Sequence, residues 1–171
     1  MPSKLIALGT LLNIKWINNM ILTKNLISDA IAKEKSLEKK IIFTNGCFDI
    51  IHSGHVTYLN ESKQLGDILV IGLNSDQSVR RLKGINRPIN IQQDRAIVLD
   101  NLKAVDFVTI FDEDTPYNLI SIIKPDIITK GGDYTKENVV GYDIVNKYGG
   151  KVVIINLVEG KSTTSIINKI M

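Results

Sequence analysis

From residue 41 to the end, the sequence alternates short apolar runs with longer amphipathic segments, and this alternation restricts the fold more than any other feature. The apolar runs carry isoleucine and valine at consecutive positions, as expected for strands that are buried on both faces. The intervening segments carry apolar residues at helical spacing, so each is predicted as a helix that connects two parallel strands. The alternation therefore predicts a doubly wound, Rossmann-like α/β fold around a five-stranded parallel sheet.

Turn residues and helix caps set the expected boundaries. We expect strands at residues 41–44, 68–73, 107–111, 126–129 and 152–155. Helices are expected at about 54–66 with Ser53 as the cap, at 91–103, 115–123 and 137–147, and from Ser162 onward. Residues 73–90 are expected as a loop. The pattern divides the chain into a domain over residues 41–171 and an N-terminal extension over 1–40, of which 21–40 form a charged helix.

The first 20 residues leave three interpretations open. The apolar run from Leu5 to Leu12 faintly resembles a signal peptide, but no small-residue cleavage site follows it. The same residues would suit an accessory helix, or they would lie upstream of a true start at Met20.

The composition limits which classes of ligand the protein could bind. A length of 171 residues suits one catalytic-sized domain, and a net charge of +3 without a basic run argues against nucleic acid as a partner. No apolar run reaches the 18 or so residues of a membrane span, so we expect no membrane partner. Cys47 is the single cysteine, which excludes an internal disulfide and fits a reducing, cytoplasmic compartment. A small anionic ligand is the better match for this composition.

The loop after the first predicted strand holds both histidines of the chain. Ligands of open parallel sheets bind at the carboxyl ends of the strands, and this loop reads TNGCFDIIHSGH from Thr44 to His55. It places His52 before a helix and His55 in its first turn, where free backbone N–H groups favour a phosphate. Alternatives are a zinc site, which lacks a third ligand beyond Cys47, a Cys47 nucleophile, and two core histidines.

Three later loops carry further candidate contacts. All four arginines lie between Arg80 and Arg95 around Lys83, where the alternative is a solvated basic surface. Residues 130–134 read KGGDY and could cradle a ligand with glycine backbone, although a plain turn would also explain them. Residues 159–164 read EGKSTT at a helix N-terminus and form either a second anion site or an ordinary cap.

The first loop resembles the signature of the nucleotidyltransferase α/β phosphodiesterase superfamily, whose fold carries an HxGH motif. The matching residues are Gly46, Phe48, Asp49, His52, Gly54 and His55. The ordered set TNGCFD-x-x-H-x-GH, LKG-x-x-RP, VD-x-V-x-x-FDEDTP, KGGDY and EGKSTT covers residues 41–171 and resembles the heptose 1-phosphate adenylyltransferases. That resemblance implies transfer of AMP from ATP to D-glycero-β-D-manno-heptose 1-phosphate, giving ADP-heptose for lipopolysaccharide or another heptose glycan.

The resemblance also implies roles for individual residues. The catalytic residues would be His52, His55 and Lys83. The nucleotide would be bound by Thr44, Asn45, Gly46, Cys47, Phe48, His52, His55, Lys130, Gly131, Asp133, Ser162, Thr163 and Thr164. The acceptor would be bound by Lys83, Arg87 and Arg95. Mg²⁺ is expected to be held by the phosphates with no protein metal site, and the chain is expected to form a homodimer or a higher homo-oligomer.

Two alternatives remain at this stage. Glycerol 3-phosphate cytidylyltransferases are close relatives by motif, but they carry an arginine before the end motif where this chain has Leu157, and GDDW where it has residues 131–134. These departures favour the heptose enzymes over transfer from CTP to a phosphorylated alcohol. The other alternative is a regulatory module that binds a nucleotide and catalyses nothing.

Overall fold

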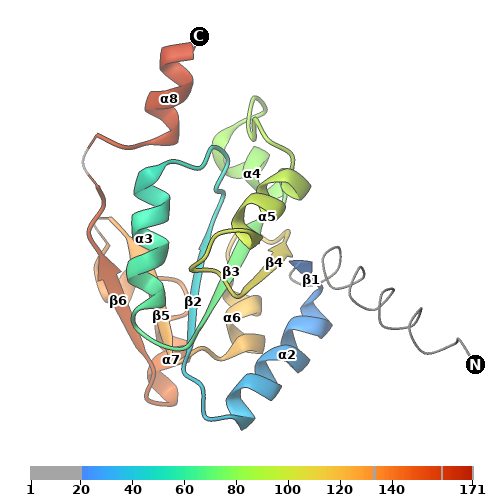
Figure 1. The fold of residues 1–171 in the computed structure, drawn as a ribbon, viewed down its shortest axis with the longest axis vertical. Helices are drawn as coiled ribbons and strands as arrows, with labels where there is room; N and C mark the ends of the chain where they lie inside the picture. The colour runs from blue at the N-terminus through green and yellow to red at the C-terminus, as the bar shows by residue number, and fades with distance from the viewer. Residues whose placement is uncertain (1–20, 133, 159, 171) are drawn as a thin grey trace, which may run out of the picture.

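A single parallel sheet organises the molecule (Figure 1). The computed structural model describes residues 21–132, 134–158 and 160–170. The strands are β1 (Ile21–Leu22), β2 (Ile41–Gly46), β3 (Ile68–Asn74), β4 (Phe107–Phe111), β5 (Ile127–Gly131) and β6 (Lys151–Ile155). They are ordered β1-β4-β3-β2-β5-β6, and every neighbouring pair is parallel. The predicted doubly wound α/β fold is confirmed, with a sixth, two-residue edge strand that the sequence pattern assigns to the leading helix.

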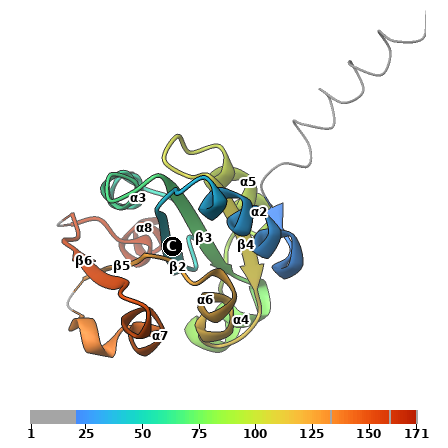
Figure 2. The same cartoon turned by 90° about the horizontal axis from the view of Figure 1, so that it is seen from below.

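Helices cover both faces of the sheet. They are α2 (Lys24–Ser36), α3 (Ser53–Lys63), α4 (Asp76–Lys83), α5 (Gln92–Asp100), α6 (Tyr117–Ile123), α7 (Tyr142–Lys147) and α8 (Thr163–Ile170), with a 3₁₀ turn η1 (Lys136–Asn138). One core cluster packs α2, α6 and α7 against Phe43, Val70 and Ile128. The other packs α3 and α5 against Ile42 and Leu69 on the opposite face. Figure 2 shows α3 on one side of the sheet and α6 and α7 on the other.

Three expected boundaries are wrong. Helix α4 lies inside the segment expected as a loop, and its N-cap is Ser75, whose Oγ accepts from the Ser78 N–H at 3.0 Å. The N-cap of α3 is His52 rather than Ser53. The helix expected over 137–147 is divided into η1 and α7 at Gly141, which has φ of +90° and where a Cβ would lie 2.7 Å from Ile120 Cδ1.

The strand order reverses between β2 and β5. The chain runs outward from β2 through β3 to β4, and then crosses back to place β5 on the other side of β2. Strands β2 and β5 are paired at Ile42–Ile127 and Phe43–Ile128. The helices that follow them, α3 and α7, pack against opposite faces of the sheet. Such a reversal leaves a crevice at the carboxyl ends of the two strands.

A buried hydroxyl chain holds the two strands and α3 together below this crevice. The Tyr58 hydroxyl lies 2.6 Å from Thr44 Oγ1 and donates to Thr129 Oγ1 at 3.2 Å. Ser62 Oγ lies 2.9 Å from the same Thr129 oxygen. Hydroxyls both donate and accept, so the buried groups satisfy one another where the β2–β5 pairing has ended.

No helix within the described residues is both long and apolar enough to cross a membrane. The expectations for residues 1–20 lie outside the described part of the chain.

Candidate functional site

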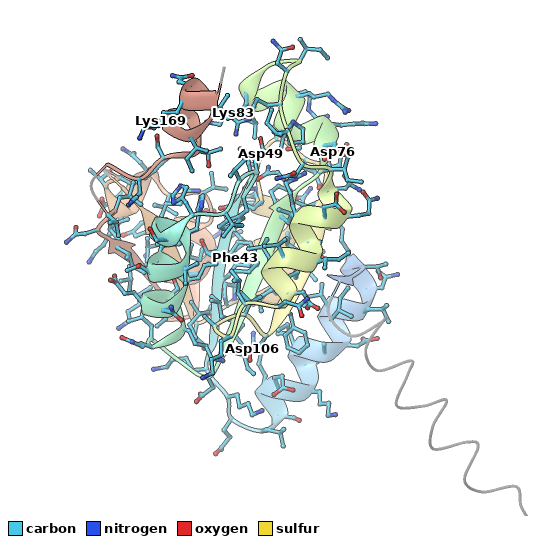
Figure 3. The ribbon with its side chains drawn as sticks, turned by 45° about the horizontal axis from the view of Figure 1, so that its top comes forward. Phe43, Asp49, Asp76, Lys83, Asp106 and Lys169 are labelled. Carbon is cyan, nitrogen blue, oxygen red and sulfur yellow. The ribbon has the colours of Figure 1, made fainter. Side chains whose placement is uncertain are left out.

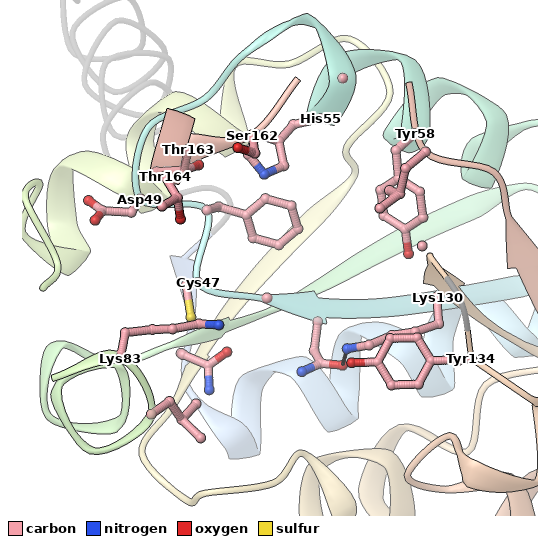
Figure 4. Close-up of a pocket in the computed structure, with 18 of the residues that line it drawn as sticks. Cys47, Asp49, His55, Tyr58, Lys83, Lys130, Tyr134, Ser162, Thr163 and Thr164 are labelled. Atoms are coloured by element: carbon pink, nitrogen blue, oxygen red, sulfur yellow. Dashed lines mark hydrogen bonds between the residues drawn. The ribbon is translucent and has the colours of Figure 1, made fainter. Parts of the chain in front are cut away.

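A cavity of about 660 Å³ opens at the carboxyl ends of β2 and β5, where the strand order reverses (Figure 4). Figure 3 places Asp49, Asp76 and Lys83 at this end of the sheet and Asp106 at the opposite end. The cavity brings together most of the predicted site residues. Those lining it are Asn45, Gly46, Cys47, Phe48, His52, His55, Lys83, Arg87, Lys130, Gly131, Ser162, Thr163 and Thr164.

Three predicted contacts are not found there. Thr44 is fully buried beneath the cavity in the hydroxyl chain with Tyr58, so it is a structural residue in this fold. Arg95 does not line the cavity, and its side chain is fully buried. Asp133 lies outside the described residues.

The two histidines stack at the N-terminus of α3. Their ring centroids are 3.9 Å apart with an interplanar angle of 29°. His55 Nδ1 accepts from the backbone N–H of His52 at 3.4 Å, which in a neutral ring leaves Nε2 as the protonated nitrogen. His52 Nδ1 is buried and has no hydrogen-bond partner among the described residues. Both rings therefore retain hydrogen-bonding capacity for a ligand.

Burial keeps these histidines neutral when no ligand is bound. Burial, with a smaller contribution from neighbouring His52, lowers the pKa of His55 to about 4. Burial and the nearby Lys161 ammonium lower the pKa of His52. A polyphosphate in the cavity would oppose both effects, because a nearby negative charge favours the imidazolium form.

Gly54 makes room for this arrangement between the two histidines. A Cβ at this position would lie 3.0 Å from His52 Nδ1 and 3.1 Å from Lys161 Cβ. A side chain would therefore push the His52 ring and the segment leading into α8 apart. The glycine of the HxGH motif is explained by close packing.

Asp49 joins the histidine loop to the loop after α4. Its carboxylate accepts from the N–H groups of Ile89 at 2.8 Å and Asn90 at 2.9 Å, and from Arg87 Nε at 2.6 Å. Burial alone would raise the pKa of Asp49, but these hydrogen bonds outweigh it and hold the pKa below its ordinary value. Arg87 reaches the cavity rim with its charge already paired.

Arg95 supports the same loop from the side away from the cavity. Its guanidinium donates to the backbone carbonyls of Cys47 and Asn90, and pairs with Asp76 at 2.8 Å. All three nitrogens of the guanidinium thus bind other parts of the protein, and Arg95 supports the loop without lining the cavity.

Cys47, Lys83 and Lys130 all line the cavity. Figure 4 shows the Cys47 sulfur beside the Lys83 side chain. Burial raises the pKa of the Cys47 thiol, although Lys83 and two arginines act in the opposite direction. The thiol therefore stays protonated at neutral pH, which argues against Cys47 as a nucleophile.

The N-terminus of α8 closes the histidine side of the cavity. Ser162 Oγ accepts from the Ser165 N–H at 3.0 Å, and Thr163 Oγ1 donates to the Ile50 carbonyl at 3.2 Å. The second contact attaches α8 to the histidine loop. Two helix N-termini thus meet at one place, where their partial positive charges and free N–H groups suit an anion.

Several residues that line the cavity are not among the site residues predicted from the sequence. They include Tyr58, Asn74, Tyr134, Asn138 and Lys161. Asn74 ends β3 in the structure and lies one residue beyond the predicted strand, so a rule that includes the residue after each predicted strand would have found it. Tyr58 resembles an ordinary core residue on a helix, and only the three-dimensional arrangement shows its hydroxyl between the two strands.

Carboxylates are poorly placed for holding a metal here. Within residues 21–132, 134–158 and 160–170, no group of three or more His, Cys, Asp or Glu side chains could hold an ion. Asp49 is saturated by its partners, and Asp114 pairs with Arg81 at 2.7 Å. The donor set consists mainly of imidazoles, ammonium groups and hydroxyls, which suits phosphate better than Mg²⁺.

Comparison with known proteins places residues 43–169 in a family described as cytidylyltransferase-like. The chain is 51% identical over 154 residues to the bifunctional protein HldE of Syntrophotalea carbinolica, covering 90% of this chain and 31% of that protein. It is 60% identical over 131 residues to HldE of a Nitratiruptor species, covering 77% of this chain and 28% of that protein. The chain thus spans less than a third of these relatives.

A solved structure also resembles this fold. The lipopolysaccharide core biosynthesis protein from Thermoplasma volcanium is 33% identical, with a TM-score of 0.59. The match covers 72% of this chain and 99% of that one.

We predict that Asp49 makes stability depend on acidic pH. Its lowered pKa means that the ionised carboxylate stabilises the fold above its unfolded pKa of about 4, and that this contribution is lost as pH falls through the folded-state pKa. Asp49→Asn should lower the free energy of unfolding by about 2 kcal/mol at pH 7, measured by urea denaturation. The difference from wild type should shrink below about pH 4. An equal difference at all pH values would contradict this.

We also predict a ligand-dependent titration of His55. In the free protein its ring should titrate with a pKa of about 4, followed by NMR of the two histidines, with His52→Asn to assign them. Since an unfolded histidine titrates near pH 6.5, stability should fall as pH is lowered from about 6.5 towards the folded-state pKa. Saturating ATP should raise the pKa of His55, and an unchanged titration would place the triphosphate elsewhere.

Proposed function

We propose that this chain, which belongs to the cytidylyltransferase-like family of nucleotidyltransferases, transfers AMP from ATP to D-glycero-β-D-manno-heptose 1-phosphate. The products would be ADP-heptose and pyrophosphate. The observation that carries the proposal is the stacked His52–His55 pair at the N-terminus of α3, inside the cavity at the strand reversal. The similarity to the bifunctional HldE proteins and the KGGDY and EGKSTT segments support the sugar phosphate as acceptor.

The histidine side of the cavity would hold the triphosphate. His52 and His55 would donate hydrogen bonds to it, and the N-termini of α3 and α8 would add backbone N–H groups. The backbone of Gly46 to Phe48 and the hydroxyls of Ser162 to Thr164 would contact the phosphates. The nucleoside would lie along Gly131. ATP would enter as its magnesium complex, with the ion held by the phosphates.

The reaction needs no strong base. An oxygen of the acceptor phosphate would attack the α-phosphorus, while the bond from that phosphorus to the bridging oxygen breaks and its electron pair leaves with pyrophosphate. The acceptor is already an anion, so no proton has to be removed. Among the described residues, the two carboxylates that line the cavity, Asp49 and Asp114, are engaged in ion pairs, in agreement with such a mechanism. Rate enhancement would come from in-line positioning and from charge stabilisation.

The second candidate is transfer of CMP from CTP to glycerol 3-phosphate or a similar phosphorylated alcohol. The description of the matching family favours it as the alternative. Its acceptor has the same reactive group, so the histidine pair alone does not separate the two.

Further features belong to the same proposal. Residues 41–171 would form the catalytic domain and residues 1–40 an extension, of which β1 and α2 pack onto the sheet of that domain. The enzyme would act in the cytoplasm, where ATP is available, as a homodimer or a higher homo-oligomer. Arg87, at the cavity rim, would contribute to acceptor binding.

A panel of substrates tests the proposal. Pyrophosphate release is measured with ATP, CTP, GTP and UTP, each combined with heptose 1-phosphate and with glycerol 3-phosphate. We expect the highest kcat/KM for ATP with heptose 1-phosphate. Highest activity with CTP and glycerol 3-phosphate would establish the second candidate. Nucleotide binding without pyrophosphate release from any pair would indicate a regulatory module.

The histidine pair is tested by substitution. His55→Ala should leave the fold intact and lower kcat about a hundredfold or more, like the loss of one donor to a transition-state oxyanion. Asn60→Ala, at an exposed position on the same helix, serves as the matched control. Circular dichroism and thermal midpoints establish folding of both variants. A folded His55→Ala protein with wild-type turnover would refute the catalytic assignment.

A further inference from the structure

Three lysines line the cavity, and one of them, Lys161, lies near His52. The other two have no acidic partner among the described residues. These are Lys83 at the end of α4 and Lys130 at the end of β5. Within the part of the chain that the structure describes, neither side chain is within ion-pair distance of a carboxylate. Burial lowers the pKa of Lys130, and the neighbouring Lys83 charge lowers it further. An anion between the two would relieve this repulsion.

Side-chain alternation along the strands places Lys130 on the face opposite the histidines. Thr44 and Thr129 face α3, because both contact the Tyr58 hydroxyl. Their successors Asn45 and Lys130 therefore point to the other face, which α6 and α7 cover. Lys130 Nζ donates to Asn45 Oδ1 at 3.2 Å, in agreement with this placement.

A second contact orients the same ammonium group. Lys130 Nζ lies 5.6 Å from the centroid of the Tyr134 ring. A neutral amide and an aromatic ring hold the ammonium group without cancelling its charge. The charge thus remains available to a ligand.

The cavity is therefore divided by the end of β2. Figure 4 shows His55 and residues 162–164 on one side of this strand, and Lys83, Lys130 and Tyr134 on the other. In-line transfer requires the attacking and leaving oxygens to lie on opposite sides of the phosphorus. If the histidines hold the leaving pyrophosphate, the attacking group must come from the lysine side.

We propose that Lys130 is a catalytic residue that binds the phosphate group of the acceptor together with Lys83, rather than a nucleoside contact as the sequence motif predicts. The inference rests on the proposed function, because it takes the histidine side as the triphosphate site. Two cations without acidic partners among the described residues match a phosphate monoester better than a neutral alcohol. The acceptor class is thus a sugar phosphate or another phosphomonoester.

Substitution of Lys130 distinguishes binding of the acceptor phosphate from binding of the nucleoside, because the first affects KM for the acceptor and the second affects KM for ATP. Lys130→Gln should raise KM for the acceptor phosphate about tenfold to a hundredfold and lower kcat, while KM for ATP stays at the wild-type value. Lys130→Arg should recover part of the loss, because it keeps the charge. Lys136→Gln, at an exposed position on η1, is the matched control and should behave as wild type. Thermal midpoints establish that each variant is folded.

The opposite pattern of changes in the two KM values would overturn the inference. If Lys130→Gln raises KM for ATP and leaves KM for the acceptor unchanged, Lys130 is a nucleoside contact. If neither constant changes, it is not in the substrate path.

A binding experiment tests the role of Lys130 without requiring that the acceptor be known. Inorganic phosphate is titrated calorimetrically into protein saturated with α,β-methylene-ATP. We expect wild type and Lys136→Gln to bind phosphate, and Lys130→Gln to bind it about tenfold more weakly, with equal affinity of all three for the nucleotide analogue. Absence of phosphate binding by wild type, or equal binding by all three, contradicts the inference. If no acceptor in the substrate panel gives pyrophosphate, the proposed function is refuted. The calorimetric titration still shows whether Lys130 binds phosphate.

Discussion

The junction of β2, β5 and α3 determines the shape of the site. Pairing between the two strands is recorded at Ile42–Ile127 and Phe43–Ile128, and the Tyr58 hydroxyl then takes its place between Thr44 and Thr129. Together with Ser62, these four hydroxyl groups satisfy one another in a buried position, where an unpaired polar group would be strongly destabilising. Because Tyr58 belongs to α3, whose N-cap is His52, the same bonds that join the strands also set the position of the histidine pair relative to the sheet.

The loop between β2 and α3 is held by charged side chains that bind other parts of the protein. Asp49 binds two backbone N–H groups and Arg87, and Arg95 binds two backbone carbonyls and Asp76. These groups stabilise the backbone of the loop from both directions. The residues left to face the cavity are therefore presented by a loop with little freedom, as charge stabilisation of a transition state requires.

Much of this structure could be predicted from the sequence, for identifiable reasons. The buried strands were predictable because runs of isoleucine and valine are typical of strands covered on both faces. The position of the histidine pair in the site was predictable because it follows such a strand. Helix α4 was missed because its sequence DQSVRRLK is almost entirely polar and buries mainly Ser78 and Val79. Arg95 was assigned to substrate because spacing along the chain does not reveal whether a guanidinium points into a cavity or towards backbone carbonyls. Tyr58 was missed because its function depends on two threonines that are 85 residues apart in sequence.

The alternation of side chains at the ends of β2 and β5 has an evolutionary consequence. Neighbouring residues on each strand serve opposite faces, so the half of the cavity built from α3 and α8 shares few side chains with the half built near α6 and α7. If the acceptor binds in the second half, as proposed above, substitutions there change which molecule receives the nucleotide without disturbing the histidine pair in the first half. A lineage with this architecture can then acquire new acceptors by changes in one half and keep its chemistry.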